Sequence, residues 1–211
     1  MGLPAEASIT ESHDSRTRLI EAATAAFLEE GYRASVERIA ARAGVAKQTL
    51  YNHFPRKDDL FSEVVRHGTA SVLVSLDGDG APLPERLQRF AVAFRKRVLD
   101  AEGIAFYRAV VAEAPRFPEL TTAFYGSGPA QTIRRLAAVI AEAMDAGELR
   151  RDDPVFAAEQ LTSMLVETER TRRLLSDKPA PPPRPADAAR ILDVFLRAYA
   201  PDAPDTKRSP R

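Results

Sequence analysis

The sequence contains no cysteine in its 211 residues. Disulfide bonds, thiol nucleophiles and cysteine-ligated metal sites are therefore excluded, and the composition suits a reducing compartment. The chain also lacks an excess of charge of either sign, because 30 lysines and arginines balance 30 aspartates and glutamates. Binding to a polyanion would then depend on a local basic patch, since the whole molecule has no strong field.

Long apolar runs are missing as well. No stretch approaches the roughly 18 consecutive apolar residues that a transmembrane helix needs. The first 16 residues have no apolar core behind a basic segment, which a signal peptide would require. We therefore expect a soluble, cytoplasmic protein with no membrane partner.

Motifs that would indicate an enzyme are also absent. The sequence has no HExxH motif, no Walker loop and no dinucleotide-binding glycine loop. Its three histidines are far apart along the chain, at His13, His53 and His67. We therefore predict no catalytic residues, no metal site and no cofactor, and we expect that the protein is not an enzyme.

What the sequence does contain is helical periodicity. Hydrophobic residues make up 45% of the chain, and they recur at intervals of three and four over 19–27, 87–98, 133–144 and 191–199. No run alternates apolar and polar residues as an exposed strand would. The predicted fold is all-α.

Breaks in this periodicity divide the chain. We expect a disordered arm over 1–13, a helix-turn-helix domain over 14–56, a larger helical domain over 57–200 and a disordered tail over 201–211. The larger domain begins with a linking helix at 57–76, and a connector with five prolines at 177–187 lies near its end.

The segment after the first helix has the pattern of a helix-turn-helix. Two short helices are expected at 36–43 and 46–54, joined by a tight turn at Gly44. Leu50 and its apolar neighbours face inward, while the second helix presents polar side chains outward. Those side chains suit the major groove of DNA, where amides pair with adenine and lysine pairs with guanine: Lys47, Gln48, Thr49, Asn52 and His53.

Charge is concentrated in the same segment. Between Arg33 and Lys57 the sequence has six basic residues and a single acidic one, Glu37, which gives a local net charge of +5. Such a patch can neutralise several phosphates, so that DNA affinity would fall steeply with salt. The alternative interpretation is a solvated helical hairpin with incidental basic residues, and the pattern alone leaves both open.

The segment "SVERIAARAGVAKQTLYNHFPRKDDLF" resembles the DNA-binding region of the TetR family of bacterial transcription regulators. The resemblance covers about residues 15–65, and one departure is Ala46, where the family usually has serine or threonine. It implies that the second helix reads bases and that neighbouring residues hold phosphates. The base-reading residues would be Lys47, Gln48, Thr49 and Asn52, and the phosphate-binding residues Tyr51, His53 and Lys57 with help from Arg33 and Ser35.

The second half is similar to the AefR-like subgroup of the same family, through "FYRAVVAEAPRFPELTTAFYGSGP". The resemblance implies a homodimer that binds an inverted-repeat DNA operator and a small-molecule effector, most often as a repressor. The aromatic side chains of this half favour an apolar or aromatic molecule as the effector. The hypothetical pocket contains Phe94, Phe106, Tyr107, Arg108, Val110, Phe124, Tyr125 and Glu167.

Each of these aromatic residues has a plainer interpretation as ordinary core, because aromatic stripes at helical spacing are usually buried. For the dimer interface, we expect the last two helices to pack across a two-fold axis. The predicted contacts are Leu161, Met164, Leu165, Ile191, Phe195 and Tyr199. A second class of function, an all-α carrier or enzyme with a purely structural helix-turn-helix, must explain the local charge of +5.

Overall fold

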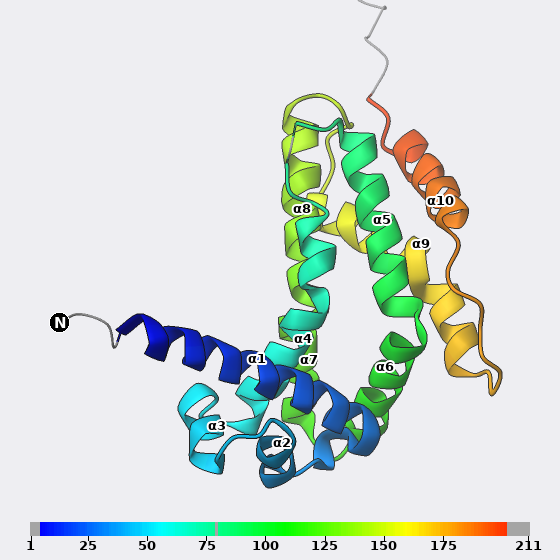
Figure 1. The fold of residues 1–211 in the computed structure, drawn as a ribbon. Coiled ribbons are helices and arrows are strands. Elements are labelled where there is room, and N and C mark those ends of the chain that lie inside the picture. The colour runs from blue at the N-terminus through cyan, green and yellow to red at the C-terminus, as the bar shows by residue number, and fades with distance from the viewer. Residues whose placement is uncertain (1–4, 79, 202–211) are drawn as a thin grey trace, which may run out of the picture. The chain divides into compact units, whose positions relative to one another are not determined.

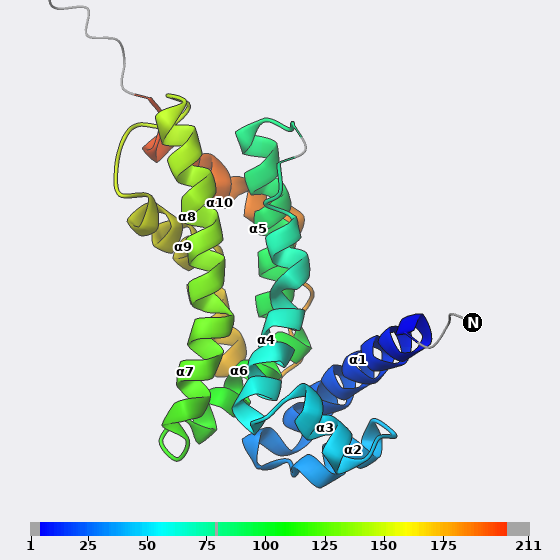
Figure 2. The same cartoon turned by 90° about the vertical axis from the view of Figure 1, so that its left-hand side faces the viewer.

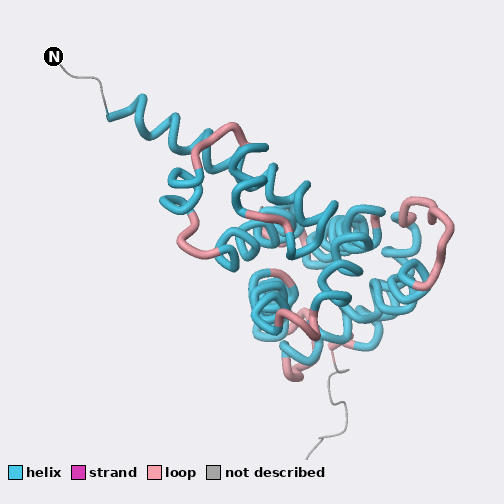
Figure 3. Tube along the Cα trace, turned by 90° about the horizontal axis from the view of Figure 1, so that it is seen from below, coloured by secondary structure: helices cyan, strands magenta, loops and turns pink. Residues whose placement is uncertain are grey.

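The computed structural model describes residues 5–78 and 80–201, with side chains from residue 14 onward. Over these residues the backbone forms helices and loops without a strand (Figure 3), so the all-α prediction is confirmed. None of the described helices combines the length and the apolar character that crossing a bilayer would require.

The N-terminal helix is longer than the sequence indicated. Helix α1 spans Ala5–Glu30, so the backbone is helical at 5–13, where we predicted a disordered arm. The difference follows from local propensity, because Ala5, Glu6 and Ala7 are good helix formers and come directly after a proline. Residues 1–4 and 202–211, which include most of the predicted tail, lie outside the described residues.

The chain forms two compact units, each assembled from separate segments. The first compact unit consists of Met1–Ala70, Asp100–Gln131 and Arg173–Ala180, and the second compact unit of Ser71–Leu99, Thr132–Arg172 and Pro181–Arg211. Helix α4 (Lys57–Val74) runs from the first unit into the second. The sequence suggested a single boundary at residue 57, whereas each compact unit combines three separate segments of the chain.

The first compact unit is built around α1. This helix packs against α2 (Val36–Arg42) and α3 (Lys47–His53), as Figures 1 and 2 show. A short 3₁₀ helix, η1 (Gly31–Arg33), follows α1, and α6 (Ala101–Glu113) and α7 (Pro118–Ser127) complete the unit. Apolar side chains from these helices and from the part of α4 that belongs to this unit share one core, whose largest fully buried members include Phe27, Ile39, Leu50 and Phe61.

The second compact unit contains α5 (Leu83–Leu99), α8 (Pro129–Asp145), α9 (Pro154–Leu174) and α10 (Pro185–Ala198). Helices α5 and α10 lie side by side (Figure 1). Leucine, isoleucine and phenylalanine side chains at helical spacing fill the core, among them Leu87, Phe90, Leu136, Ile140 and Phe195. Burial of this apolar surface is the main force that holds the helices together.

Candidate nucleic-acid interface

Helices α2 and α3 are joined by a turn that depends on Gly44. This glycine has a φ of +67°, in the left-handed region that residues with a Cβ rarely adopt. Its N–H donates to the carbonyl of Ala41 at 3.1 Å, and the N–H of Val45 donates to that of Ala40 at 3.0 Å. The turn therefore satisfies the end of α2 and redirects the chain into α3 within a few residues.

The two helices differ in how they begin. Ser35 is the N-cap of α2, where its hydroxyl accepts a hydrogen bond from the N–H of Arg38 at 3.2 Å. Ala46 is the N-cap of α3 and has the extended backbone of a capping residue, with φ −69° and ψ 149°, but no side chain that can accept. The N-terminus of α3 consequently lacks the side-chain cap that α2 has.

Buried apolar residues fix the angle between the two helices. Ile39 of α2 and Leu50 of α3 have no exposed surface, and Phe54, just after α3, is 3% exposed. Ala40 and Ala43 are also buried in this contact. With its inner face held in this way, α3 turns its opposite face to solvent.

The outer face of α3 carries the residues that were predicted to read bases. Lys47, Gln48 and Asn52 are exposed, and Thr49 is partly exposed. The amide nitrogen of Gln48 donates to the side-chain oxygen of Asn52 at 3.1 Å. That bond leaves the Asn52 amide donors and the Gln48 oxygen available, which is the combination that a base edge can pair with.

The residues predicted to hold phosphates differ in how far they are exposed to solvent. Tyr51 is 37% exposed, with the Lys47 ammonium 5.7 Å from its ring centre. His53 is partly buried, and its Nε2 lies 3.0 Å from the Ser15 hydroxyl on α1. Tyr51 thus presents its surface to solvent from α3, whereas His53 ties α3 to α1.

Lys57 is turned inward. Its ammonium group donates to the backbone carbonyl of Tyr32 and lies 4.5 Å from the centre of the Tyr32 ring. Burial lowers the pKa of Lys57 below the usual value of a lysine. In this structure Lys57 therefore fastens the start of α4 to η1 and does not extend toward solvent as a phosphate ligand would.

The two supporting residues before α2 also have local partners. Arg33 lies 3.3 Å from a carboxylate oxygen of Glu113 on α6, while more than half of its side chain remains exposed. Ser35 is occupied as the cap of α2. Arg33 is therefore accessible to a phosphate, and Ser35 contributes by positioning α2.

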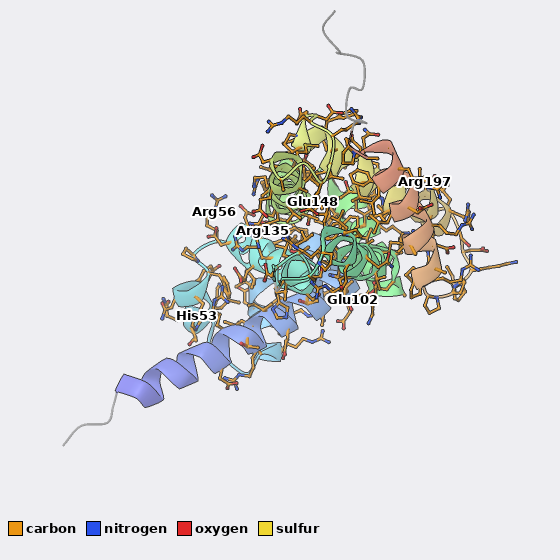
Figure 4. The ribbon with its side chains drawn as sticks, turned by 90° about the horizontal axis from the view of Figure 1, so that it is seen from above. His53, Arg56, Glu102, Arg135, Glu148 and Arg197 are labelled. Atoms are coloured by element: carbon orange, nitrogen blue, oxygen red, sulfur yellow. The ribbon has the colours of Figure 1, made fainter. Side chains whose placement is uncertain are left out.

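The remaining bases of the segment from Arg33 to Lys57 all face acidic groups. Arg38 contacts Glu30 at 2.8 Å, Lys47 contacts Glu37 at 2.5 Å, and Arg42 makes a bidentate pair with Glu29 at 2.8 and 2.9 Å. The Arg56 side chain, which extends outward from the α3–α4 connection in Figure 4, contacts Asp58 at 2.5 Å. In three dimensions, the local charge of +5 is largely compensated by acids that lie outside the segment.

Helix α1 contributes residues that the sequence did not reveal. Ser15 meets His53, and Arg16 lies 2.9 Å from Glu63 of α4 and 5.4 Å from the centre of the Phe54 ring. These pairs are separated by 38 residues or more along the chain, so helical periodicity carries no sign of them. They show that α1 positions both α3 and α4.

The structure brings together part of the predicted effector pocket. Phe106 and Tyr107 of α6 lie 6.2 and 6.0 Å from Phe124 of α7, measured between ring centres, and Phe106 stacks on Phe61 at 5.6 Å. Phe106 and Val110 are buried in the core of the first compact unit, as the plainer interpretation held. Only Tyr107 and Phe124 are partly exposed members of this cluster.

The other predicted pocket residues lie elsewhere. Arg108 is exposed and donates to the carbonyls of Arg173 and Leu174, and Tyr125 is 57% exposed. Phe94 and Glu167 belong to the second compact unit, where Phe94 stacks on Phe90 at 5.3 Å and Glu167 pairs with Arg170. Of the predicted pocket residues, those that contact one another within one compact unit are therefore the aromatic residues Phe106, Tyr107 and Phe124 of α6 and α7.

The predicted dimer contacts divide into two groups. Leu161, Leu165, Phe195 and Tyr199 are at most 5% exposed, because they pack into the core of their own chain. Met164 is 40% exposed and Ile191 is partly exposed. Three exposed apolar residues on the same two helices were not among the predicted contacts: Val155, Phe156 and Val194.

An open cavity of about 180 Å³ adjoins these accessible residues in the second compact unit, with Met164 and Ile191 in its lining. Arg95 of α5 also lines it and is buried, donating to the carbonyl of Leu165 and, at 2.6 Å, to the carboxylate of Glu169. The pairing satisfies a charge that would otherwise be costly to bury. Among the described residues, no three histidine, aspartate or glutamate side chains gather so as to hold a metal ion.

Comparison with known families covers most of the chain. Residues 19–64 match the family described as bacterial regulatory proteins, tetR family. Residues 85–201 match the C-terminal domain of AefR-like transcriptional repressors.

Individual relatives agree with these matches. The chain is 28% identical over 176 residues to the HTH-type transcriptional repressor DhaR of Mycobacterium sp. (strain GP1), covering 76% of this chain and 86% of that protein. A solved structure named flavonoid-responsive regulator FrrA is 35% identical, with a TM-score of 0.68 over 90% of this chain and 98% of that one. A TetR-family regulator from Mesorhizobium loti is 28% identical, with a TM-score of 0.73 and the same coverage.

Proposed function

Because the chain belongs to the TetR family of bacterial transcription regulators, we propose that it is a ligand-responsive repressor. As a homodimer it binds an inverted-repeat operator in cytoplasmic DNA, and a small-molecule effector releases it. The residues proposed to contact bases are Lys47, Gln48, Thr49 and Asn52.

The observation that supports this proposal most strongly is the two-faced character of α3. Its inner face is fixed by Leu50, which is completely buried, and its outer face presents lysine and amide side chains to solvent. A helix of this kind, rigidly held by a second helix across a glycine turn, is suited to lie in the major groove. A purely structural hairpin has no need for amide groups with unused donors and acceptors along one face.

For dimerisation we propose the exposed apolar face of α9 and α10. It consists of Val155, Phe156 and Met164 on α9 with Ile191 and Val194 on α10. Exposed apolar side chains on two helices that line one cavity indicate a protein contact, and the same residues on a second copy would cover them through a two-fold axis. The partner would also close the mouth of the cavity beside Met164 and Ile191.

For the effector we propose an apolar molecule with an aromatic ring. Tyr107 and Phe124 are partly exposed rings that contact each other at 6.0 Å between their centres, and their exposed surface is one on which an aromatic ligand could pack. The relative that is 35% identical is named for its response to a flavonoid, which is consistent with this class of compound.

Release would proceed through α4, which joins the two compact units as one continuous helix. An effector that binds better to one position of α4 shifts the molecule toward that position, and the recognition helices follow because α4 is anchored to η1 through Lys57. Each tenfold loss of operator affinity requires a difference of about 1.4 kcal/mol in effector binding, which lies in the usual range of allosteric coupling.

Selection of binding sites from a random duplex library tests this function. Purified protein should enrich an inverted repeat, and an aromatic compound that binds the protein should reduce its affinity for that site. If no motif is enriched, or if binding is equally strong on all sequences, the carrier interpretation gains and the repressor interpretation fails.

A further inference from the structure

Three glutamates lie against the basic side chains of the helix-turn-helix. Glu29 and Glu30, in the last turn of α1, reach Arg42 and Arg38 of α2. Glu37 of α2 reaches Lys47, the first residue of α3. The contact distances of 2.8, 2.8 and 2.5 Å are those of direct charge-assisted hydrogen bonds.

The first two of these glutamates have no stabilising role within their own helix. A carboxylate at the C-terminus of a helix is unfavourable because that end carries partial negative charge, and the last turn of α1 has no basic residue to offset it. All six charged side chains are between 28% and 67% exposed, and exposed ion pairs contribute little to stability. Their larger effect is on the electric field over the surface that faces DNA.

We propose that Glu29, Glu30 and Glu37 are specificity-determining residues, which act as built-in counterions and weaken binding to DNA of arbitrary sequence. The inference rests on the proposed function as a DNA-binding regulator. In the free protein, each glutamate neutralises one basic side chain that would otherwise attract a phosphate. Glu29 pairs with Arg42, Glu30 with Arg38 and Glu37 with Lys47.

The physical reason lies in what is released on binding. A free lysine or arginine displaces condensed cations from DNA, and this release supplies most of the affinity for arbitrary sequence. A basic side chain that already pairs with a carboxylate must exchange that carboxylate for a phosphate. The released carboxylate then lies near the phosphates and repels them. A basic side chain that is paired with a glutamate therefore adds less to the affinity for DNA of arbitrary sequence than an unpaired one does.

An operator differs from arbitrary DNA because it also offers base edges to α3. Lys47 can leave Glu37 for a guanine edge, and Gln48 and Asn52 form their own base contacts. On a wrong sequence Lys47 has no guanine edge to take the place of Glu37, so the cost of separating the ion pairs is offset less than it is on the operator. The glutamates consequently raise the ratio of specific to non-specific binding, which decides how well a regulator finds its site in a genome.

The test compares glutamine variants on two duplexes, the operator selected from the library and a scrambled duplex of the same composition. Affinities are measured for the wild type, for Glu29→Gln, Glu30→Gln and Glu37→Gln, and for the triple variant, at salt concentrations from about 50 to 200 mM. Asp145→Asn is the matched control: it also removes one exposed negative charge from an ion pair, with Arg151 in the second compact unit.

We expect each glutamine substitution to raise affinity for the scrambled duplex by about 3- to 10-fold at low salt. The slope of log affinity against log salt concentration should steepen by about 1 for each basic side chain that loses its glutamate partner in a bound protomer. Operator affinity should rise less, so that the ratio between the two duplexes falls. Asp145→Asn should leave both the slope and the ratio unchanged.

Equal slopes for the wild type and the triple variant would overturn the inference. So would a lower melting temperature with no change in slope, which is the result of a purely structural role; if the triple variant does not fold, the single variants decide. Wild-type protein that binds no operator would contradict the proposed function itself. In that case the specificity part of the inference fails with it, and only the counterion role is left, which stands if the triple variant gains affinity for the scrambled duplex and fails if it does not.

Discussion

The contacts around Tyr32 show how burial decides what a charged side chain does. The Tyr32 hydroxyl donates to the carboxylate of Asp58, and the Lys57 ammonium donates to the Tyr32 carbonyl and lies over its ring. Burial, together with the Asp58 carboxylate, raises the pKa of Tyr32 above its usual value, while burial lowers that of Lys57. These residues fasten η1 to the start of α4, the helix proposed to carry the effector signal.

Glu63 leads to a prediction about pH. It accepts hydrogen bonds from Arg66 at 2.7 Å and lies 2.9 Å from Arg16 of α1. Burial raises the pKa of Glu63, but the hydrogen bonds from Arg16 and Arg66 outweigh burial and hold the pKa below its ordinary value of 4.5. A carboxylate with a depressed pKa in the folded state stabilises the protein at neutral pH, and the stabilisation is lost as pH falls through that folded-state pKa.

Glu63→Gln should therefore lower the melting temperature at pH 7, and the difference from wild type should shrink below pH 4.5. Thermal unfolding followed by circular dichroism over this range checks the prediction. Asp145→Asn, at a more exposed ion pair, serves as the control and should show little difference at any pH. A constant difference between wild type and Glu63→Gln would show that ionisation of Glu63 is not involved.

Gly128 gives a second prediction at this scale, because a Cβ there has no room. It would lie 2.9 Å from Val65 Cγ1 and 3.3 Å from the Phe124 carbonyl oxygen. We expect Gly128→Ala to reduce the free energy of unfolding by about 1–3 kcal/mol, as overpacking does in a filled core. Urea denaturation measures this change.

Gly126→Ala is the matched control for Gly128→Ala. A Cβ at Gly126, in the last turn of α7, meets no atom within 4 Å, so alanine there should raise stability by up to about 0.5 kcal/mol. Val65→Ala combined with Gly128→Ala should recover part of the loss. If the two glycine variants had the same stability, the close contact would not be the cause.

At the scale of elements, the start of α3 is the least satisfied part of the helix-turn-helix. Ala46 has the backbone conformation of an N-cap but lacks an acceptor, whereas Ser35 caps α2 through its hydroxyl. We expect Ala46→Ser to increase the free energy of unfolding by about 1 kcal/mol, because the hydroxyl would satisfy an N–H in the first turn of α3.

Chemical denaturation of Ala46→Ser, Ala46→Gly and Ser35→Ala measures the capping contributions. Ser35→Ala should lose about as much stability as Ala46→Ser gains, and Ala46→Gly should gain most of what Ala46→Ser gains, falling short of it by only a few tenths of a kcal/mol. A serine at position 46 that left stability unchanged would mean that the first turn of α3 is already well solvated.

The helices themselves could be predicted from the sequence, but their partners could not. The apolar periodicity and Gly44 are local signals, and α2, the turn and α3 lie where those signals indicated. The pairs between Glu29 and Arg42 or between Ser15 and His53 depend on how α1 crosses the other helices. That crossing is set by tertiary packing, which a periodic pattern in a single helix does not contain.

The same limit explains the dimer contacts. On α9 and α10, apolar residues at helical spacing occupy both the side that faces the core and the side that faces out. Periodicity ranks Leu161 and Phe195 as highly as Phe156 and Val194, although the first two are buried in their own chain. Only the three-dimensional arrangement separates an internal face from one available to a partner.

At the scale of the whole molecule, we predict that the exposed face of α9 and α10 makes the protein a dimer. Phe156→Asp places a charge in the proposed contact, where it would be desolvated without a partner, so the variant should be monomeric. Sedimentation or light scattering measures the mass. Affinity for an inverted repeat should fall as well, because two linked recognition helices are lost.

Val111→Asp is the control for Phe156→Asp, since Val111 on α6 is exposed to a similar degree, at 53% compared with 50%. This variant should remain dimeric. If Phe156→Asp also remained dimeric and well folded, the dimer would have to use another surface.

Whether α3 reads DNA is tested by comparing the binding sites that the wild type and a recognition-helix variant select from a random duplex library. Gln48→Lys changes an exposed residue of α3, and Ala138→Lys adds the same charge at an exposed position of α8. We expect wild type and Ala138→Lys to select the same inverted repeat, and Gln48→Lys to change the preferred base toward guanine at one symmetric position in each half-site. An unchanged motif for Gln48→Lys, or no motif for the wild type, would contradict base reading by α3.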